Sequence, residues 1–216
     1  YTYDLPSLKS FLTKKDLPGY VASQVFDWVY KKHELDVDKM RNISKKNRES
    51  LKDLIELTPF RKVDTQTSKE ENAIKNGCHL DDGKIVECVI LKEKTYHTLC
   101  ISSQVGCPVD CKFCLTGVMG FKRQLTSHEI VAQVAQSFAM GYPISNIVFM
   151  GMGEPLLNYK NVFQAIDHLC AEETYNVSRR KITVSTSGYI QGVKQLIKDE
   201  RFINLAFSVG SADPVK

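Results

Sequence analysis

Long hydrophobic runs are missing from this sequence of 216 residues. Its most apolar stretch, residues 144–152, is far shorter than the roughly 20 residues that a membrane-spanning helix needs. No cationic segment with an apolar core opens the sequence as a secretory signal would. We therefore expect a cytoplasmic protein with no membrane partner. Repeats and low-complexity tracts are also absent, and 43% hydrophobic with 25% charged residues excludes disordered, collagen-like and coiled-coil chains.

An excess of one charge is missing as well. The 29 basic and 25 acidic residues give a net charge of +4, and they are spread along the chain. This balance permits binding to nucleic acid but shows no basic patch that would indicate it.

Cysteine is more informative. There are seven, an odd number, and without an export signal we do not expect a secreted disulfide framework. Three of them lie within eight residues, and Cys100 is just upstream of these three. The remaining cysteines are scattered, as small buried hydrophobic residues are, at Cys78, Cys88 and Cys170.

The first 58 residues are typical of a small helical domain. Apolar residues at helical spacing predict a helix over Gly19–His33, and Ser44 is a suitable N-cap for a second helix that ends near Ile55. Residues 59–104 form a β-rich extension, because β-branched residues predict strands at Lys84–Leu91 and Thr95–Ser103.

Strands and helices alternate over residues 105–216, which indicates βαβ units, a parallel sheet and an α/β fold. A capping box at Thr126 and Glu129 opens the first helix. In such folds the site lies at the carboxyl ends of the strands. The expected helices are Thr126–Met140, Asn158–Leu169 and Ile190–Lys198, and the expected strands are Ile144–Met150, Lys181–Ser185 and Ile203–Val209. This pattern predicts about four parallel strands. Because a full barrel has eight, we expect a partial, truncated βα barrel.

The cysteine loop Gly106–Cys114 has the spacing C-x3-C-x2-C. A structural zinc site takes four ligands, so His97 or His128 would have to join the three thiols. An iron–sulfur cluster held by three thiolates instead leaves one iron open to bind another molecule. The iron–sulfur interpretation suits one tight loop better, and zinc remains the alternative.

A second motif, Met150–Pro155, directly follows the strand expected at Ile144–Met150. Its glycines allow the backbone to approach a ligand closely, and the Glu154 carboxylate is an acceptor for an ammonium group.

Both motifs resemble the radical S-adenosylmethionine (SAM) superfamily, in which three cysteines hold a 4Fe–4S cluster and the open iron chelates SAM. The resemblance narrows to the ribosomal RNA adenine-C2 methyltransferases (RlmN-like) and the related C8-methylating resistance enzymes (Cfr-like). It rests on Cys100–Cys107, Thr116-Gly117, Gly120-Phe121, Met150–Asn158 and Arg179–Gly188.

The resemblance implies a role for each matching residue. Cys107, Cys111 and Cys114 would be the cluster ligands. Cys100 would resolve a protein–RNA crosslink, and Glu87 would accept a proton in the final step. The residues implied to contact SAM are Gly153, Glu154, Ser185, Ser208, Val209 and Gly210.

The resemblance also implies a reaction and partners. Adenine C2 is not nucleophilic, so the methyl group would pass through a methylated cysteine and a radical generated from a second SAM. The implied substrates are adenine 2503 of 23S ribosomal RNA and also transfer RNA. An electron donor such as flavodoxin and a monomeric state are implied too. The alternatives are C8 methylation, a radical SAM reaction on another substrate, and a zinc-dependent RNA-binding module without enzymatic activity.

Two features depart from the family pattern. No cysteine near the carboxyl end can carry the methyl group, because Cys170 comes too early. Gly210 stands where the family has a histidine that contacts SAM. We therefore expect the natural protein to continue beyond residue 216 and this fragment to be unable to methylate.

Overall fold

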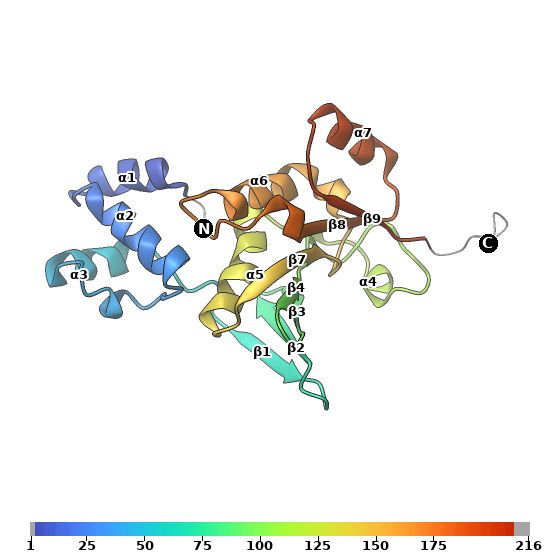
Figure 1. Ribbon diagram of the computed structural model, residues 1–216, viewed down its shortest axis with the longest axis horizontal. Coiled ribbons are helices and arrows are strands. Elements are labelled where there is room, and N and C mark those ends of the chain that lie inside the picture. The colour runs from blue at the N-terminus through green and yellow to red at the C-terminus, as the bar shows by residue number, and fades with distance from the viewer. Residues whose placement is uncertain (1–2, 210–216) are drawn as a thin grey trace.

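The computed structural model describes residues 3–209 and places a group of helices beside a seven-stranded sheet (Figure 1). Both helices predicted in the N-terminal part are present, and a preceding helix was not predicted. In chain order these elements are α1 (Leu5–Thr13), α2 (Tyr20–Phe26), a π-helical segment (Asp27–Lys31), a 3-10 turn (Val37–Lys39) and α3 (Lys45–Leu54).

Short polar side chains begin these helices. Asp4 accepts a hydrogen bond from the backbone N–H of Ser7 at 2.8 Å, and the predicted N-cap Ser44 accepts one from Asn47 at 3.3 Å. The helices bury a hydrophobic core of their own, whose innermost members are Leu12, Val21, Met40, Ile43 and Leu51. The domain boundaries at residues 58 and 104 stay predictions.

The sheet has the strand order β1-β2-β3-β4-β7-β8-β9. β1 to β4 pair antiparallel, whereas β4, β7, β8 and β9 are parallel, as the alternation of strands and helices predicted. β5 (Gln104–Val105) and β6 (Arg123–Gln124) form a separate small hairpin. The strands of the large sheet are β1 (Val63–Thr67), β2 (Ala73–His79), β3 (Ile85–Lys92), β4 (His97–Cys100), β7 (Ile144–Phe149), β8 (Ile182–Thr186) and β9 (Asn204–Phe207).

β1 and β2 were not predicted, and their composition explains why. β1 is a polar edge strand whose side chains are largely exposed, so it has no apolar alternation. β2 buries Asn76 between Ile74 and Cys78, which breaks its apolar pattern. Asn76 is satisfied there because its carbonyl oxygen accepts a hydrogen bond from the Thr65 hydroxyl at 2.9 Å.

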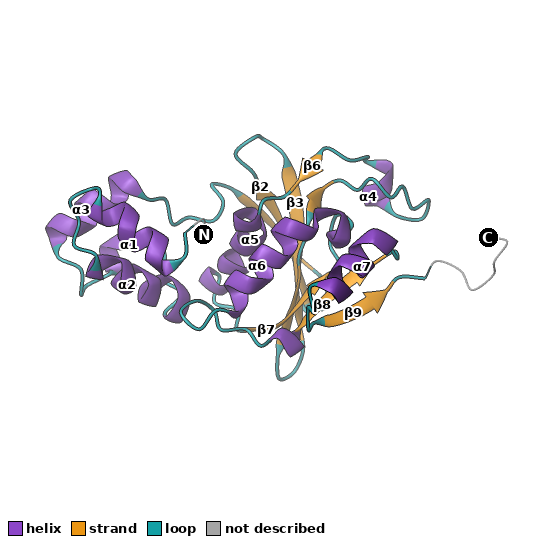
Figure 2. Ribbon diagram, turned by 90° about the horizontal axis from the view of Figure 1, so that it is seen from above, coloured by secondary structure: helices purple, strands orange, loops and turns teal. Residues whose placement is uncertain are grey.

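The three long helices after the cysteine loop, α5 (Ser127–Ala139), α6 (Tyr159–Cys170) and α7 (Ile190–Lys198), cover one face of the sheet (Figure 2). A short helix, α4 (Leu115–Val118), directly follows the cysteine loop, and 3-10 turns occupy Pro155–Asn158 and Arg179–Lys181. The predicted capping box is confirmed, because Thr126 and Glu129 cap each other at the start of α5.

The other face of the sheet carries a row of paired residues. Val89, Cys100, Val148 and Thr183 are register partners on β3, β4, β7 and β8. Their chain neighbours, such as Leu99 and Ile147, are fully buried in the core beneath the helices. Because side chains alternate along a strand, the row points away from the helices.

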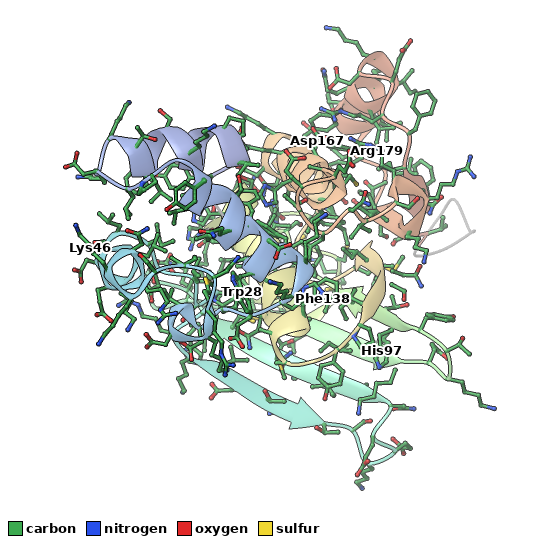
Figure 3. All side chains as sticks on the ribbon, turned by 60° about the vertical axis from the view of Figure 1, so that its left-hand side comes forward. Trp28, Lys46, His97, Phe138, Asp167 and Arg179 are labelled. Carbon is green, nitrogen blue, oxygen red and sulfur yellow. The ribbon has the colours of Figure 1, made fainter. Side chains whose placement is uncertain are left out.

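Aromatic side chains join the N-terminal helices to the rest of the molecule. Phe138 of α5 stacks on His33 with ring centroids 4.3 Å apart and on Tyr175 at 4.9 Å (Figure 3). Asp167 of α6 pairs with Arg179 at 2.6 Å (Figure 3).

Candidate cofactor site

Four of the residues singled out in the sequence lie at or near the carboxyl ends of the parallel strands, as expected. Cys100 is the last residue of β4, Glu154 follows β7, Ser185 lies in β8, and Ser208 follows β9. The cysteine loop leaves the sheet just beyond β4, between β5 and β6. Strand topology therefore brings together segments that are more than a hundred residues apart in the sequence.

The cysteine loop is held in a compact shape by its own backbone. Cys114 N–H donates to the Cys111 carbonyl at 3.0 Å, and Gly117 N–H donates to the Cys114 carbonyl at 3.0 Å. A Cβ atom on Gly117 would lie 3.0 Å from that same Cys111 oxygen. The three thiols are partly exposed and remain accessible to a ligand.

The charges of neighbouring side chains act on the Cys107 thiol. Burial raises the pKa of the Cys107 thiol, a hydrogen bond from the Val109 backbone lowers it, and the nearby Cys111, Glu154 and Cys114 raise it again. Cationic iron bound to the thiols would remove this repulsion, because metal coordination favours the thiolate. Glu154 therefore lies near enough to the cysteine loop for its charge to act on Cys107.

The donor set fits an iron–sulfur cluster better than zinc. Within residues 3–209, no three side chains among His, Cys, Asp and Glu converge on the position of a single ion. Tetrahedral zinc needs four ligands about 2.3 Å from one metal atom. Zinc would therefore need a fourth ligand besides the three thiols, whereas a polynuclear cluster held by three thiolates leaves one iron open to another molecule.

Gly106 anchors the base of the cysteine loop. Its φ is +76°, a left-handed conformation that favours glycine, and an added Cβ would lie 1.8 Å from the carbonyl oxygen of Gly120. The two ends of the loop also pair as strands, with Gln104 opposite Gln124. The loop therefore begins and ends at one fixed point.

Glu154 is buried, and its carboxylate is held in one orientation. Its Oε2 accepts hydrogen bonds from the backbone N–H of Ser187 at 2.8 Å and from the Ser187 hydroxyl at 2.9 Å. Its Oε1 accepts one from Leu156 N–H at 3.1 Å. A carboxylate has about four acceptor positions, so three donors leave room for one further donor, such as an ammonium group.

The serines implied to contact SAM lie on adjacent strands. The hydroxyl groups of Ser185 and Ser208 are 2.9 Å apart, and Ser208 N–H donates to the Thr186 carbonyl at 2.9 Å. Val209 is exposed at the end of this segment. Gly210 lies outside the described residues.

Cys100 is half-buried at the end of its strand. Burial raises the pKa of its thiol to about 11, against a smaller lowering by a backbone hydrogen bond from Met150. The side chain is therefore a protonated thiol at neutral pH, and it must lose its proton before it can act as a nucleophile.

Glu87 lies on the same face of the sheet as Cys100. It is two residues from Val89, the register partner of Cys100, and its carboxylate pairs with Lys75 of β2 at 3.0 Å. The carbonyl oxygen of Glu87 accepts a hydrogen bond from Ser102 at 2.6 Å. The structure brings Glu87 and Cys100 to neighbouring strands, with Glu87 in an ion pair.

Several polar residues that support the site were missed in the sequence. Ser102 and Gln104 are completely buried, and Asn158 is nearly so. Asn158 donates to the carbonyl oxygens of Ser103 at 2.8 Å and Leu125 at 2.7 Å. The missed signal was polarity: Ser102-Ser103-Gln104 continues a buried strand where apolar residues would be expected.

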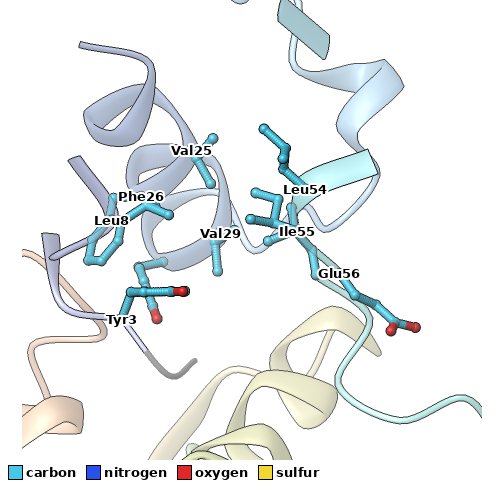
Figure 4. A pocket seen from close by; sticks show the side chains of 10 residues that line it. Tyr3, Leu8, Val25, Phe26, Val29, Leu54, Ile55 and Glu56 are labelled. Carbon is cyan, nitrogen blue, oxygen red and sulfur yellow. The ribbon is translucent and has the colours of Figure 1, made fainter. Parts of the chain in front are cut away.

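A separate pocket of about 220 Å³ lies among the N-terminal helices and the segment after α3 (Figure 4). Its walls are mostly apolar, and Glu56 stands at its edge. It lies apart from the cysteine loop, so it is not part of the cofactor site.

Comparison with known proteins gives two family matches. Residues 1–57 match the ribosomal RNA large subunit methyltransferase N-terminal domain, and residues 101–215 match the radical SAM superfamily. The chain belongs to the radical SAM superfamily, whose members use a 4Fe–4S cluster and SAM.

Individual relatives narrow the comparison. A probable dual-specificity RNA methyltransferase RlmN from Aquifex aeolicus is 42% identical, over 99% of this chain and 62% of the relative. One from Dictyoglomus thermophilum is 38% identical, over 96% and 60%. The crystal structure of a radical SAM methyltransferase from Sphaerobacter thermophilus shares 36% identity with a TM-score of 0.86, over 95% of this chain and 61% of that one.

These matches confirm the resemblance to the RlmN-like methyltransferases and the partial barrel fold. The chain spans about three fifths of the length of the relatives it matches. No helix within residues 3–209 is long and apolar enough to cross a membrane.

Proposed function

We propose that the protein represented by this chain methylates C2 of an adenine in RNA, at adenine 2503 of 23S ribosomal RNA and also in transfer RNA. The reaction would take place in the cytoplasm. The observation that carries the proposal is that Cys100 ends β4 shortly before the three-cysteine loop, while the buried Glu154 follows the neighbouring strand β7. The matches to the RlmN-type relatives cover 96% to 99% of this chain.

In this proposal each residue has one task. Cys107, Cys111 and Cys114 hold the cluster, and Glu154 accepts a hydrogen bond from the amino group of SAM. The Ser185 and Ser208 hydroxyls, together with Gly153, Val209 and Gly210, line the remainder of the SAM site. When bound, the cluster and SAM supply the radical chemistry that an unreactive adenine carbon requires.

Cys100 is proposed to cleave the link between the RNA and a second cysteine supplied by the rest of the protein. Because its pKa is about 11, Cys100 needs a nearby base at neutral pH. Glu87 is the proposed proton acceptor in the final step, since its carboxylate lies on the same face of the sheet as Cys100. The adenine must leave its stack to reach this position. The flavodoxin-type electron donor and the monomeric state stay predictions.

The first test is the metal content of this chain after anaerobic reconstitution with iron and sulfide. We expect about four iron and four sulfide per chain, and a loss of both in Cys111→Ala. One bound zinc without sulfide would overturn the proposal and favour the zinc-binding alternative.

The second test uses a version extended to the length of the relatives. It should methylate adenine C2 in 23S ribosomal RNA and fail to release product in Cys100→Ala, leaving a protein–RNA adduct. Methylation at C8 would favour the Cfr-like alternative. SAM cleavage without methylation of RNA would indicate another substrate.

A further inference from the structure

We propose that Gln104 and Gln124 are positioning residues that hold Glu154 in place for the amino group of SAM. They do so as two links of a directional chain of hydrogen bonds. This inference rests on the proposed function, because it concerns how the same site binds SAM. Nothing in the comparisons assigns a role to either glutamine.

The hydrogen-bond chain runs through three segments of the molecule. The Glu154 N–H donates to Oε1 of Gln104 at 2.8 Å. Nε2 of Gln104 then donates to Oε1 of Gln124 at 2.8 Å, and Nε2 of Gln124 donates to the Leu157 carbonyl at 2.9 Å. Gln104 lies on β5 before the cysteine loop, and Gln124 lies on β6 after it. Both ends of the loop are thereby connected to the segment that carries Glu154.

The direction of this chain is fixed by its two ends. The Glu154 N–H can only donate, and the Leu157 carbonyl can only accept. Each glutamine amide must therefore place its oxygen toward Glu154 and its nitrogen toward Leu157. If either amide turned over, two like groups would face each other inside the molecule, where an unsatisfied polar group is costly.

Close packing adds a second constraint on the same peptide. Gly153 has a φ of +106°, and an added Cβ would lie 2.6 Å from the Gln104 Cβ and 2.7 Å from its Cγ. The Gln104 stem therefore packs against Gly153 while its amide binds the next N–H. Together these contacts hold the peptide between Gly153 and Glu154. These contacts fix the position of the Glu154 backbone, and the hydrogen bonds from Ser187 fix the orientation of its carboxylate.

The position of Glu154 relative to the cysteines depends on this connection. The backbone N–H groups of Ser103 and Gln104 donate to the Met152 carbonyl at 2.9 Å and 3.1 Å, which joins the segment before the cysteine loop to the segment before Glu154. SAM would have to reach both the cluster and the Glu154 carboxylate. A shift of the cysteine loop relative to the segment that carries Glu154 would therefore weaken SAM binding. Gln104 lies three residues before Cys107 and contacts the Glu154 peptide directly.

The test measures SAM binding to this chain after anaerobic reconstitution, through the change that SAM causes in the EPR spectrum of the reduced cluster. Gln104→Ala should keep its iron and sulfide but bind SAM at least 10-fold more weakly. Gln124→Leu should weaken binding about 3- to 10-fold. Unchanged SAM affinity in Gln104→Ala would overturn the positioning role, and so would loss of the cluster in that variant.

Gln124→Glu gives a readout that a merely structural role would not produce. At pH 8 its carboxylate would face the Leu157 carbonyl with no proton to donate, and SAM binding should weaken. The Leu157 carbonyl beside it disfavours the charged form, so the protonated fraction should grow as the pH falls from 8 to 5. A protonated carboxyl group can accept from Gln104 and donate to Leu157. SAM affinity should then recover in this variant and not increase in the wild-type chain. An affinity ratio of variant to wild type that stays constant with pH contradicts the directional chain.

The matched control is Gln133→Ala. Gln133 is also a fully buried glutamine, and its amide accepts from Ser102 N–H at 2.9 Å and donates to the Ser102 carbonyl at 3.0 Å. Its loss should lower the melting temperature but leave SAM affinity within 2-fold. If the wild-type chain takes up iron and sulfide and binds SAM, and Gln104→Ala binds SAM with the same affinity, only the positioning role fails. If the wild-type chain takes up no cluster, the proposed function fails with it.

Discussion

The hydroxyl group of Tyr30 lies 2.9 Å from Nε2 of His168 and connects the N-terminal helices to α6. Burial lowers the pKa of His168 to about 4, from an ordinary value of 6.5. The imidazole is therefore neutral in the folded chain, and it takes up a proton more readily in the unfolded chain.

The first prediction concerns this contact and pH. Because the pKa is depressed on folding, the stabilisation is present above about pH 6.5 and is lost as the pH falls toward 4. We expect the free energy of unfolding to drop by about 1–3 kcal/mol over that window, at about 1.4 kcal/mol per pKa unit at most. Chemical denaturation of the cluster-free chain at pH 7 and pH 4.5 measures this loss.

His168→Gln should remove most of that pH dependence, whereas His79→Gln on β2 should retain it. An equally steep pH dependence in His168→Gln would show that other groups cause the loss. Tyr30→Phe should lower the free energy of unfolding by about 1 kcal/mol, since a hydrogen bond of this kind contributes about that much.

The second prediction concerns the Glu154 carboxylate. Glu154→Gln keeps the shape of the side chain but removes the charge that would attract an ammonium group. We expect SAM to bind more than 10-fold more weakly to the reconstituted chain, with iron and sulfide content unchanged. Ser187→Ala removes the hydroxyl donor and leaves the backbone N–H in place, so its effect should be smaller, about 2- to 5-fold.

Glu49→Gln on α3 is the control, because that carboxylate is exposed and lies far from the cysteine loop in the sequence. Within residues 3–209 it pairs with Lys52, at 3.7 Å. It should leave SAM affinity unchanged. Wild-type affinity in Glu154→Gln would remove this residue from the SAM site.

The third prediction compares two glycines with nearly equal backbone angles. Gly106 and Gly83 have φ values of +76° and +78°, but an added Cβ meets the Gly120 oxygen at 1.8 Å only in the first case. Gly83→Ala should cost about 1–2 kcal/mol for its left-handed conformation alone. Gly106→Ala should cost more and should also lose iron and sulfide uptake, because the loop must move. Equal stability and equal cluster content in the two variants would contradict the close packing at Gly106.

The fourth prediction concerns the reactivity of Cys100. With a pKa of about 11, its thiolate fraction and its rate of alkylation by iodoacetamide should rise about 10-fold per pH unit between pH 8 and 10. Fragment-ion mass spectrometry measures the modification of this residue separately. A peptide of residues 97–103, whose cysteine is exposed, serves as the control and should level off near pH 9. Rapid alkylation of Cys100 at pH 7 would show that its burial does not hold the proton.

Most of the secondary structure after residue 80 was predictable from the sequence. The capping box at Thr126, the buried strand at Ile144 and the helix at Ile190–Lys198 lie where the patterns placed them. Such features depend on residues within a few positions of each other. β1 and β2 were missed because an edge strand needs no apolar face and because Asn76 is buried through a partner on another strand.

The candidate site divides in the same way. The sequence by itself determined the spacing of Cys107, Cys111 and Cys114 and the motif around Glu154, because both lie on short continuous segments. Only the tertiary structure placed Glu87 on the face of Cys100 and joined Gln104 to Glu154, fifty residues further along the chain. Those relationships depend on strand order and register, which are decided when the helices and the sheet bury a common core.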